Sequence, residues 1–511
     1  MRKLILAHDI GTTGNKATLY NPQGELLASS FHPYPTYYPR PNWAEQDPAD
    51  WWEAVYKSTQ KLLKKSKVSP REVFCISFSG QMMGCLPVDK KGRPLRRAII
   101  WADQRGEPQA EIFRQKISES EVYKITGHRI SPTYSACKIM WIKENEPEVF
   151  KNTYKILHAK DYIIFKLTGR FLTDYSDASG MNLFDLSKKK WSEPILKATN
   201  IPQEILPEPC SSLEVAGKLL SKAAKEMGLS SGVSVVVGGG DGPCASCGAG
   251  VVEEGSWYTY LGSSAWIAIA KKEPVYDPKM RTFTFHHLHP KMYMPAGTMQ
   301  AAGASYQWLK DNICKLEKEF AQRAEVDVYD LMEIKASSVS PGSENLLFLP
   351  YLIGERSPHW NPNARGAFIG LTLAHKREHI IRSVLEGVAF NMRIILDILE
   401  KHAPVNPEMT VIGGLAQSNL FCQILADVFN RRVKKPPLVE EATSLGAAIA
   451  GGVATGLFKD LTVAKKLIKS KFTNEPSPEN RKVYEKLYPV FKKSYEALSS
   501  VYEELVSVGE E

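Results

Sequence analysis

The segment LILAHDIGTTGNKATLY (residues 4–20) combines a short apolar strand, a polar turn and a returning strand. The turn, residues 9–14, contains one aspartate, two glycines and two threonines, and a second turn follows at residues 21–24. Glycine, aspartate and asparagine favour tight turns. The pattern is typical of consecutive antiparallel hairpins rather than of a strand–helix–strand unit. It therefore predicts that the first sheet of the protein begins with hairpins.

A similar strand–turn–strand pattern recurs in the second half of the chain. Residues 258–261 form an expected strand, Gly262-Ser263-Ser264 the turn, and residues 265–270 the returning strand. The sequences of the two hairpins differ, but their repetition indicates a duplicated fold. A chain of 511 residues also exceeds one ordinary core. We place the boundary near residues 238–242, which gives an N-terminal lobe of residues 1–240 and a C-terminal lobe of residues 241–511.

Four helices can be predicted with defined starts or lengths. Asp47 can cap a helix that has Pro48 at its first position, and Ser418 can cap another that runs to about residue 429. A long helix is expected from about residue 379 to 401, and an amphipathic one near the end, at residues 480–506.

The turn at residues 9–14 has the composition of a phosphate-binding loop. Its glycines allow close approach of backbone N–H groups, Thr12 and Thr13 add hydroxyl donors, and Lys16 could supply a cation. An acid beside a nucleotide usually holds hydrated Mg²⁺, which is the role expected of Asp9. No Gly-Lys-Ser/Thr follows, so this is not a Walker loop. An ordinary hairpin turn remains the alternative.

A second candidate is the segment VVVGGGDGPCASCGAG (residues 235–250), in which Asp241 follows a strand and three glycines. A carboxylate there could accept a proton from an attacking hydroxyl, and the glycines could leave room for the substrate. A turn aspartate is the alternative. Cys244 and Cys247 offer only two metal ligands where a structural zinc site needs four. They are better explained as small apolar residues of a closely packed helix.

Polar and aromatic residues of the kind that bind sugars follow two N-terminal strands. They are Gln81, Met82 and Met83 after one strand, and Trp101, Asp103 and Arg105 after the other. Small-residue turns also follow strands at Gly262-Ser263-Ser264 and Gly413-Gly414. Several such turns, spread over both halves, suggest a cleft between lobes that holds a nucleotide.

The composition excludes several classes of function. The net charge is +9, but 56 acids are present and no basic stripe with interleaved aromatics suggests nucleic-acid binding. No apolar stretch is long enough to span a membrane, and the N-terminus reads as a strand rather than a secretory signal. We expect a cytoplasmic protein whose eight cysteines are reduced. The modest positive charge is compatible with an anionic substrate.

Several longer segments together resemble the FGGY carbohydrate kinases, and within them most closely the xylulokinases. The most specific is GAFIGLTLAHKREHIIRSVLEG (residues 366–387), and CKIMWIKEN (residues 137–145) fits most of the family's N-terminal signature. NWAEQDPADWW, LPYLIGERSPHWNPNARG and GGLAQSNLFCQILAD are also similar. The resemblance covers nearly the whole chain. It implies a two-lobed α/β fold of the actin/hexokinase type, with a duplicated ribonuclease-H-like core and ATP and sugar in the interlobe cleft.

The resemblance also implies roles for individual residues. Asp241 corresponds to the catalytic base that takes the proton of the sugar hydroxyl, and Asp9 to the Mg²⁺-side carboxylate. The expected nucleotide and phosphate contacts are Gly11, Thr12, Thr13, Lys16, Gly262, Ser263, Ser264, Gly303, Gly414 and Ser418. The expected sugar-side contacts are Gln81, Met82, Met83, Trp101, Asp103 and Arg105. The implied reaction is the ATP-dependent phosphorylation of a small sugar, with D-xylulose as the first candidate and D-xylulose 5-phosphate as its product.

One departure leaves the sugar open. Xylulokinases carry a histidine where this chain has Met83, and a thioether cannot donate a hydrogen bond. Another pentulose, a pentitol or a tetritol is therefore an alternative substrate. A nucleotide-binding scaffold without catalysis, and less so a chaperone-type ATPase, are alternatives from other classes. A homodimer stays open beside a monomer.

Overall fold

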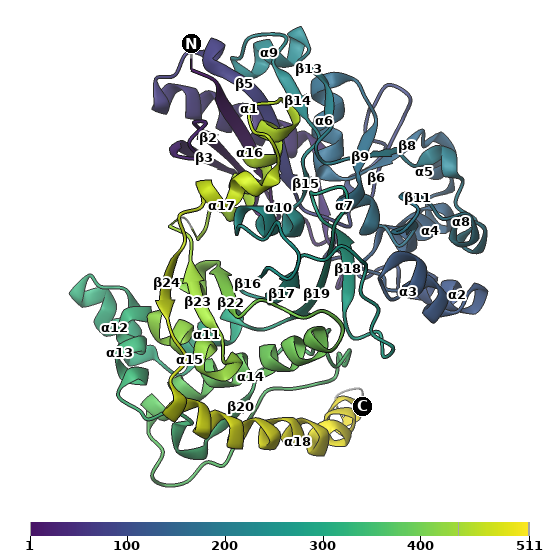
Figure 1. Ribbon diagram of the computed structural model, residues 1–511. Coiled ribbons are helices and arrows are strands. Elements are labelled where there is room, and N and C mark those ends of the chain that lie inside the picture. The colour runs from purple at the N-terminus through teal and green to yellow at the C-terminus, as the bar shows by residue number, and fades with distance from the viewer. Residues whose placement is uncertain (1, 438, 509–511) are drawn as a thin grey trace.

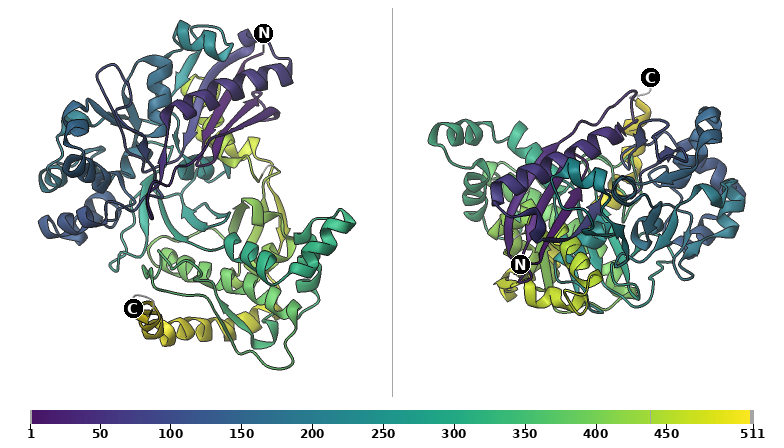
Figure 2. Two further views of the ribbon diagram at one scale, coloured as in Figure 1. Left: turned by 180° about the vertical axis from the view of Figure 1, so that it is seen from behind. Right: turned by 90° about the horizontal axis from the view of Figure 1, so that it is seen from above.

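The computed structural model describes residues 2–437 and 439–508 and shows two α/β lobes. Each lobe is built around a sheet that has seven strands within these residues. In Figure 1 the N-terminal lobe, purple to teal, lies above the C-terminal lobe, which is teal-green to yellow. The view from behind in Figure 2 shows the same division. The predicted two-lobed α/β fold is therefore confirmed.

The N-terminal sheet has the strand order β13-β14-β5-β1-β2-β3, and β15 also pairs with β5. Its strands are β1 (Leu4–Ile10), β2 (Gly14–Tyr20), β3 (Leu26–Pro33), β5 (Val73–Gly80), β13 (Val215–Lys218), β14 (Ser234–Val236) and β15 (Gly239–Gly240). Strands β1, β2 and β3 form the predicted antiparallel hairpins, whereas β5 runs parallel to β1.

The C-terminal sheet has the order β18-β19-β17-β16-β22-β23-β24. Its strands are β16 (Trp257–Leu261), β17 (Ala265–Ile269), β18 (Phe283–His286), β19 (Tyr293–Met299), β22 (Glu408–Ile412), β23 (Arg432–Lys435) and β24 (Lys471–Asn474). The hairpin β16–β17 has a parallel neighbour, β22, on the side of its first strand, just as β1–β2 has β5. The repeat expected from the two hairpin sequences is thus present in the strand pairing.

The remaining strands form short two-stranded pairs. They are β4 (Glu45–Gln46) with β7 (Ala98–Ile99), β6 (Leu86–Val88) with β8 (Lys155–Leu157), β9 (Leu172–Asp174) with β12 (Glu208–Cys210), β10 (Phe184–Asp185) with β11 (Lys190–Trp191), and β20 (Leu347–Leu349) with β21 (Ala367–Ile369).

Helices surround both sheets. In the N-terminal half they are α1 (Pro48–Ser66), α2 (Glu107–Lys116), α3 (Glu119–Thr126), α4 (Ser135–Asn145), α5 (Pro147–Asn152), α6 (Ala159–Thr168), α7 (Tyr175–Ser179), α8 (Glu193–Thr199) and α9 (Ser221–Met227). After these come α10 (Asp241–Gly248), α11 (Gly303–Asn312), α12 (Lys315–Ala324), α13 (Val328–Ser337), α14 (Arg377–His402), α15 (Asn419–Phe429), α16 (Ala442–Ala454), α17 (Ala464–Leu467) and α18 (Pro478–Val508). Within the residues that the structure describes, no helix is both long and apolar enough to cross a membrane.

Both predicted helix caps are present. The Asp47 side chain accepts a hydrogen bond from the Ala49 amide at the start of α1, at 2.9 Å. The Ser418 hydroxyl accepts one from the Phe421 amide at the start of α15, at 3.0 Å. Each cap satisfies a backbone donor that the helix itself leaves unpaired.

Two helices that follow residue 240 pack in the N-terminal lobe. The core that contains Ile5 and Cys75 of the N-terminal sheet also contains residues of α10 and α16. Figure 1 shows α16 and α17, in yellow-green, within the upper lobe. The chain thus returns to the first lobe after it has formed the second. The division of the chain at residue 240 stays a prediction.

Helices α10 and α16 contact each other backbone to backbone. A Cβ atom on Gly446 would lie 1.9 Å from the Cys244 carbonyl oxygen, and one on Gly248 would lie 1.7 Å from the Ala442 carbonyl oxygen. Cys244 and Cys247 are both fully buried between these helices and the sheet. Their sequence interpretation as small apolar residues of a closely packed helix is confirmed.

Candidate active site

The carbonyl oxygens of the turn between β1 and β2 accept hydrogen bonds from neighbouring residues of the same lobe. The Gly11 carbonyl accepts from Tyr34 and Gln81, and the Thr12 carbonyl accepts from Gln46 at 2.7 Å. The Thr13 carbonyl accepts from the Tyr34 amide at 3.2 Å. The amides of Thr12 and Thr13 have no partner within the described residues. Two backbone donors on one turn, with their carbonyls already occupied, suit an anion such as a phosphate.

Lys16, the expected phosphate cation, pairs with a carboxylate instead. Its ammonium lies 3.3 Å from Glu441 Oε1, and Glu441 stands at the start of α16. This contact joins the β1–β2 hairpin to the segment that returns from the second lobe. A phosphate would compete with Glu441 for the same ammonium.

Asp9 and Asp241 lie at neighbouring strand ends. On one side of β5, Asp9 pairs with Ser79, and on the other side Gly239 pairs with the same residue. Asp241 begins α10 directly after β15, and its carboxylate accepts the Gly242 amide at 2.7 Å. Burial raises the pKa of Asp241 to about 7, and the negative charge of Asp9 contributes to the rise. Burial also raises the pKa of Asp9.

The three glycines before Asp241 allow other residues of the protein to pack against the backbone, and they do not leave space for a substrate. A Cβ on Gly238, whose φ is +68°, would lie 1.9 Å from the Phe78 carbonyl oxygen. A Cβ on Gly239 would meet Leu288 at 2.3 Å, and one on Gly240 would meet the Met82 sulfur at 2.5 Å. The expectation that these glycines clear space for a sugar and a phosphoryl group is therefore wrong. They let β15 pack tightly, which fixes the start of α10.

A cavity of about 170 Å³ lies beside Asp241. It brings together five residues expected at the site: Met82, Met83, Trp101, Asp241 and Ser264. Its other lining residues are Tyr134, Gly242, Trp266, Phe283, Phe285, Met294, Ala296, Thr298 and Arg356. The Trp101 indole N–H donates to the Thr12 hydroxyl at 2.9 Å, so this cavity adjoins the phosphate hairpin. We refer to it below as the sugar cavity.

Gln81 contacts the phosphate hairpin and is not among the residues that line the sugar cavity. It is buried, and its amide donates to Gln46 Oε1 at 2.7 Å and to the Gly11 carbonyl at 3.3 Å. These contacts support the phosphate hairpin.

Asp103 and Arg105 bind each other instead of facing the cavity. The guanidinium donates to both carboxylate oxygens, with Nη2 at 2.7 Å from Oδ2, and it also pairs with Glu45 at 2.8 Å. It lies 3.7 Å from the centre of the Trp43 ring. The Asp103 carboxylate also accepts the Ala44 amide at 2.6 Å. Both side chains are almost fully buried, so the structure does not place them among the sugar-facing groups.

Arg356 is the charged residue among the sugar-cavity residues that sequence reasoning missed. It lines the sugar cavity and also a wider, adjoining cavity of about 790 Å³, which Trp101, Ser264 and Thr298 share. Among the described residues it forms no ion pair, and its recorded cation–π partner is Trp360, at 5.8 Å. It stands in the quoted segment LPYLIGERSPHW, but nothing in that pattern shows which side chain turns toward Asp241.

A cavity of about 590 Å³ in the C-terminal lobe collects five of the expected nucleotide contacts. These are Gly262, Ser263, Gly303, Gly414 and Ser418, which come from three separate segments of the chain. The other lining residues are Tyr260, Leu261, Tyr306, Gln307, Asp327, Tyr329, Asp330, Glu333, Leu415 and Gln417. We refer to it as the nucleotide cavity.

Close backbone contacts shape the nucleotide cavity. The Gly303 amide donates to the Gly262 carbonyl at 2.9 Å, and a Cβ on Gly303 would lie only 2.5 Å from that oxygen. A Cβ on Gly414, by contrast, would meet nothing within 4 Å. Gly303 is therefore required by packing, whereas Gly414 leaves open space. Ser418 caps α15, so its hydroxyl already has a structural partner.

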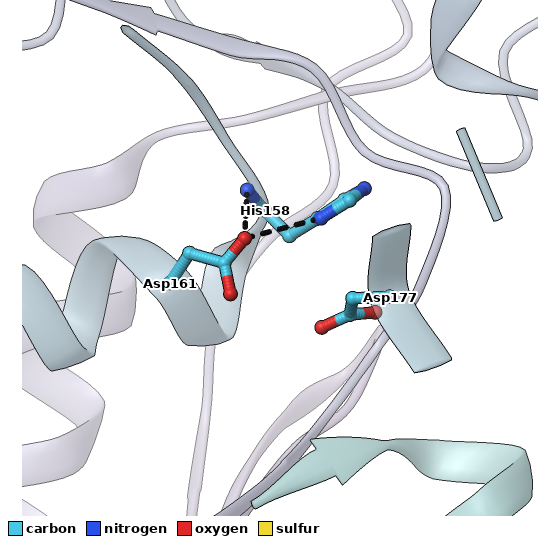
Figure 3. Close-up of side chains that lie close together, drawn as sticks. All are labelled: His158, Asp161 and Asp177. Carbon is cyan, nitrogen blue, oxygen red and sulfur yellow. Dashed lines mark hydrogen bonds and ion pairs between the residues drawn. The ribbon is translucent and has the colours of Figure 1, made fainter. Parts of the chain in front are cut away.

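A buried group of His158, Asp161 and Asp177 has the spacing of metal ligands (Figure 3). The ammonium of Lys160 lies 2.9 Å from Asp161, 3.2 Å from Asp174 and 3.2 Å from Asp177. This lysine already supplies the positive charge that the carboxylates need. The group is therefore an internal ion-pair network rather than a metal centre.

That network reaches the strand that carries Asp241. Asp174 accepts a hydrogen bond from the Ser176 hydroxyl, which in turn accepts the Gly240 amide at 2.9 Å. Ser212 donates to the same carboxylate oxygen at 2.7 Å. Buried charges therefore hold the backbone immediately before the predicted base.

Comparison with known proteins agrees with this architecture. Residues 4–248 match the N-terminal domain and residues 257–455 the C-terminal domain of the FGGY family of carbohydrate kinases. The chain therefore belongs to this family and is a sugar kinase that uses ATP.

Relatives with two different names are similar to the chain over nearly its whole length. The chain is 33% identical to a gluconokinase of Bacillus subtilis (strain 168) over 493 residues, covering 96% of this chain and 95% of that one. It is 31% identical to the xylulose kinase of the same organism over 490 residues, covering 96% of each. The ligand-bound xylulose kinase structure from Lactobacillus acidophilus superposes with a TM-score of 0.91 at 28% identity, covering 98% of this chain and 100% of that one.

Proposed function

We propose that this sugar kinase phosphorylates D-xylulose to D-xylulose 5-phosphate, with Asp241 as the general base. The observation that carries the proposed site is the β16–β17 turn. Ser263 of this turn lines the nucleotide cavity, and the next residue, Ser264, lines the sugar cavity together with Asp241. One short turn thus connects the two cavities between which a phosphoryl group would pass.

Asp241 has the properties that a general base requires. Its pKa of about 7 makes it a stronger proton acceptor than an ordinary carboxylate, yet it is largely ionised above neutral pH. A sugar hydroxyl in the cavity would transfer its proton to the Asp241 carboxylate. Its oxygen would then form a bond to the γ-phosphorus as the bond from that phosphorus to ADP breaks.

The hairpin residues would hold the phosphate chain in place. The free amides of Thr12 and Thr13 would donate to phosphate oxygens, and Lys16 would exchange Glu441 for phosphate. Positioning and charge neutralisation are the main requirements of phosphoryl transfer. A nucleotide-binding scaffold without catalysis would need none of this geometry beside Asp241.

The Asp9 site fits a magnesium ion. Its carboxylate is only partly exposed, its pKa is raised by burial, and its charge raises the pKa of Asp241. A divalent cation held by Asp9, through water, would offset the repulsion between these two carboxylates. When bound, Mg²⁺ would neutralise charge on the β- and γ-phosphate oxygens.

Two features bear on the sugar. Met83 offers the substrate a thioether instead of a hydrogen-bond donor, so another pentulose, a pentitol or a tetritol would also fit this wall. A second candidate is a sugar acid such as gluconate. It is favoured by the guanidinium of Arg356, which lines the cavity without an ion pair in the described residues and could bind a carboxylate.

An ADP-release assay tests the proposal. The purified enzyme is given Mg-ATP with D-xylulose, D-ribulose, xylitol, erythritol, glycerol or D-gluconate, and kcat/KM is measured for each. The proposal predicts the highest value for D-xylulose. A higher value for gluconate, lost in Arg356→Met while a neutral sugar is still phosphorylated, would establish the second candidate instead. A best substrate among the other polyols would contradict both assignments while leaving the kinase class intact.

A further inference from the structure

Lys138 is a fully buried lysine without an acidic partner. It lies in the CKIMWIKEN segment, within α4, and its side chain is 0% exposed. Its ammonium donates to the Met83 carbonyl at 2.8 Å and to the Thr133 carbonyl at 2.6 Å. Within residues 2–437 and 439–508 it forms no ion pair with a carboxylate. Lys160, equally buried, has three carboxylates around it.

Helix stability does not explain this lysine. Lys138 is in the first turn of α4, and its ammonium reaches back to the carbonyl of Thr133, just outside the helix start. The N-terminus of a helix carries partial positive charge, so a cation there is unfavourable. Burial adds to that cost and lowers the pKa of Lys138 to about 7. Strongly perturbed pKa values of this kind cluster at functional sites.

The two carbonyls that Lys138 binds belong to two walls of the sugar cavity. Met83 lines the cavity from the loop after β5, and Tyr134, next to Thr133, lines it from the start of α4. Met83 has a φ of +63°, a left-handed conformation that disfavours a side chain of this kind. The bond to Lys138 holds the Met83 carbonyl in the direction that this conformation requires. Lys138 thus ties together two loops that no strand pairing joins, and the Ser135 hydroxyl adds a bond to the Gly84 carbonyl at 2.8 Å.

We propose that Lys138 is a positioning residue that fixes the sugar-side wall by holding the Met83 and Thr133 carbonyls together. It acts through Met83 and Tyr134 and does not itself line the cavity. Its loss should therefore weaken sugar binding and sugar discrimination, without weakening ATP binding in the other lobe. The inference rests on the proposed sugar cavity, but it holds for any sugar that binds there.

The test compares Lys138→Met with Lys143→Met. Lys143 lies in the same helix and also donates to a carbonyl, that of Asn200 at 2.6 Å, but on the exposed side and away from the cavity. The wild-type enzyme is first given the full sugar panel, and its best substrate is used for all variants. Failure of D-xylulose alone would then refute the proposed substrate and leave this test intact. Sugar and ADP binding are also measured by calorimetry.

We expect Lys138→Met to raise the KM for sugar by at least about tenfold, because two charge-assisted hydrogen bonds are lost. The KM for ATP and the affinity for ADP should stay within about twofold, and the ratio of kcat/KM between the best and second-best sugars should fall. Lys143→Met should change none of these. An unchanged sugar KM, or an equal loss of sugar and nucleotide affinity, would overturn the proposal.

A second variant covers the case in which Lys138→Met does not fold. Lys138→Gln keeps an N–H donor but is neutral and shorter, so it should raise the sugar KM in the same direction by a smaller factor. If neither variant yields folded protein, Lys138 serves the fold rather than the sugar wall, and the proposal is wrong.

Discussion

Replacing Asp241 with asparagine should make the enzyme much less active and, at alkaline pH, more stable. Removal of a general base typically lowers the rate about 10²- to 10⁴-fold. From its pKa of about 7, Asp241 is about one-tenth ionised at pH 6 and about nine-tenths at pH 8. The wild-type kcat/KM should therefore rise nearly tenfold across this range, whereas the residual activity of Asp241→Asn should not.

The stability effect follows from the same pKa. The folded protein raises it from 3.8 to about 7, so the ionised carboxylate is less favourable in the folded than in the unfolded chain. That penalty is absent below about pH 4, develops as the pH rises to about 7, and is full above it. A rise of this size corresponds to about 4 kcal/mol, which partial exposure reduces to on the order of 1–2 kcal/mol. Asp241→Asn should gain this amount at pH 8 and nothing near pH 4.

Two measurements check these expectations. ADP release is followed for wild type and Asp241→Asn between pH 6 and 8.5, and thermal or urea unfolding is measured for both proteins at pH 4.5 and pH 8. ADP binding by calorimetry should be nearly unchanged in the variant. Near wild-type turnover in Asp241→Asn would refute the assignment of the base. A flat wild-type profile, or an equal stability change at both pH values, would refute the raised pKa.

Two further substitutions test whether buried ion pairs stabilise the fold or take part in sugar binding. Lys160→Met leaves three buried aspartates without their cation and should lower the free energy of unfolding by about 3–5 kcal/mol. The control is Lys166→Met, which replaces a half-exposed lysine of the same helix. Similar urea midpoints for the two variants would contradict a stabilising role of the network. Arg105→Lys breaks the paired contact with Asp103 and should cost about 2–4 kcal/mol in the same assay, while the sugar KM stays within about twofold. A large rise in sugar KM at unchanged stability would restore Arg105 as a sugar contact.

The local features of this fold could be predicted because neighbouring residues determine them. The hairpin of residues 4–20 and the caps at Asp47 and Ser418 depend on glycine, aspartate and serine at fixed offsets, and each is present in the structure. The sequence also indicates the duplication of the fold, because both halves contain a strand–turn–strand hairpin with a small-residue turn. These signals act over a few residues, so a single sequence contains them completely.

Contacts between distant segments could not be predicted in the same way. Asp103 and Arg105 have the chemistry of sugar ligands, and only the structure shows that they bind each other beside Trp43. The position of Arg356 in the sugar cavity depends on how a loop of the second lobe meets the first. The return of α16 to the first lobe is likewise decided by packing against β1 and β5, far away in sequence.

The surroundings of Asp241 differ from those that the sequence predicted for it. The glycines before it looked like space for a ligand, but they accommodate Phe78, Leu288 and Met82. Ser176 holds the Gly240 amide from the buried network, and α10 is locked against α16 through backbone contacts. If Asp241 is the base, as we propose, a backbone fixed on three sides would hold its carboxylate in place for the sugar. The movement that phosphoryl transfer needs would then come from the substrate, the phosphate chain or the approach of the two lobes, and the wall that we propose Lys138 holds would select the sugar.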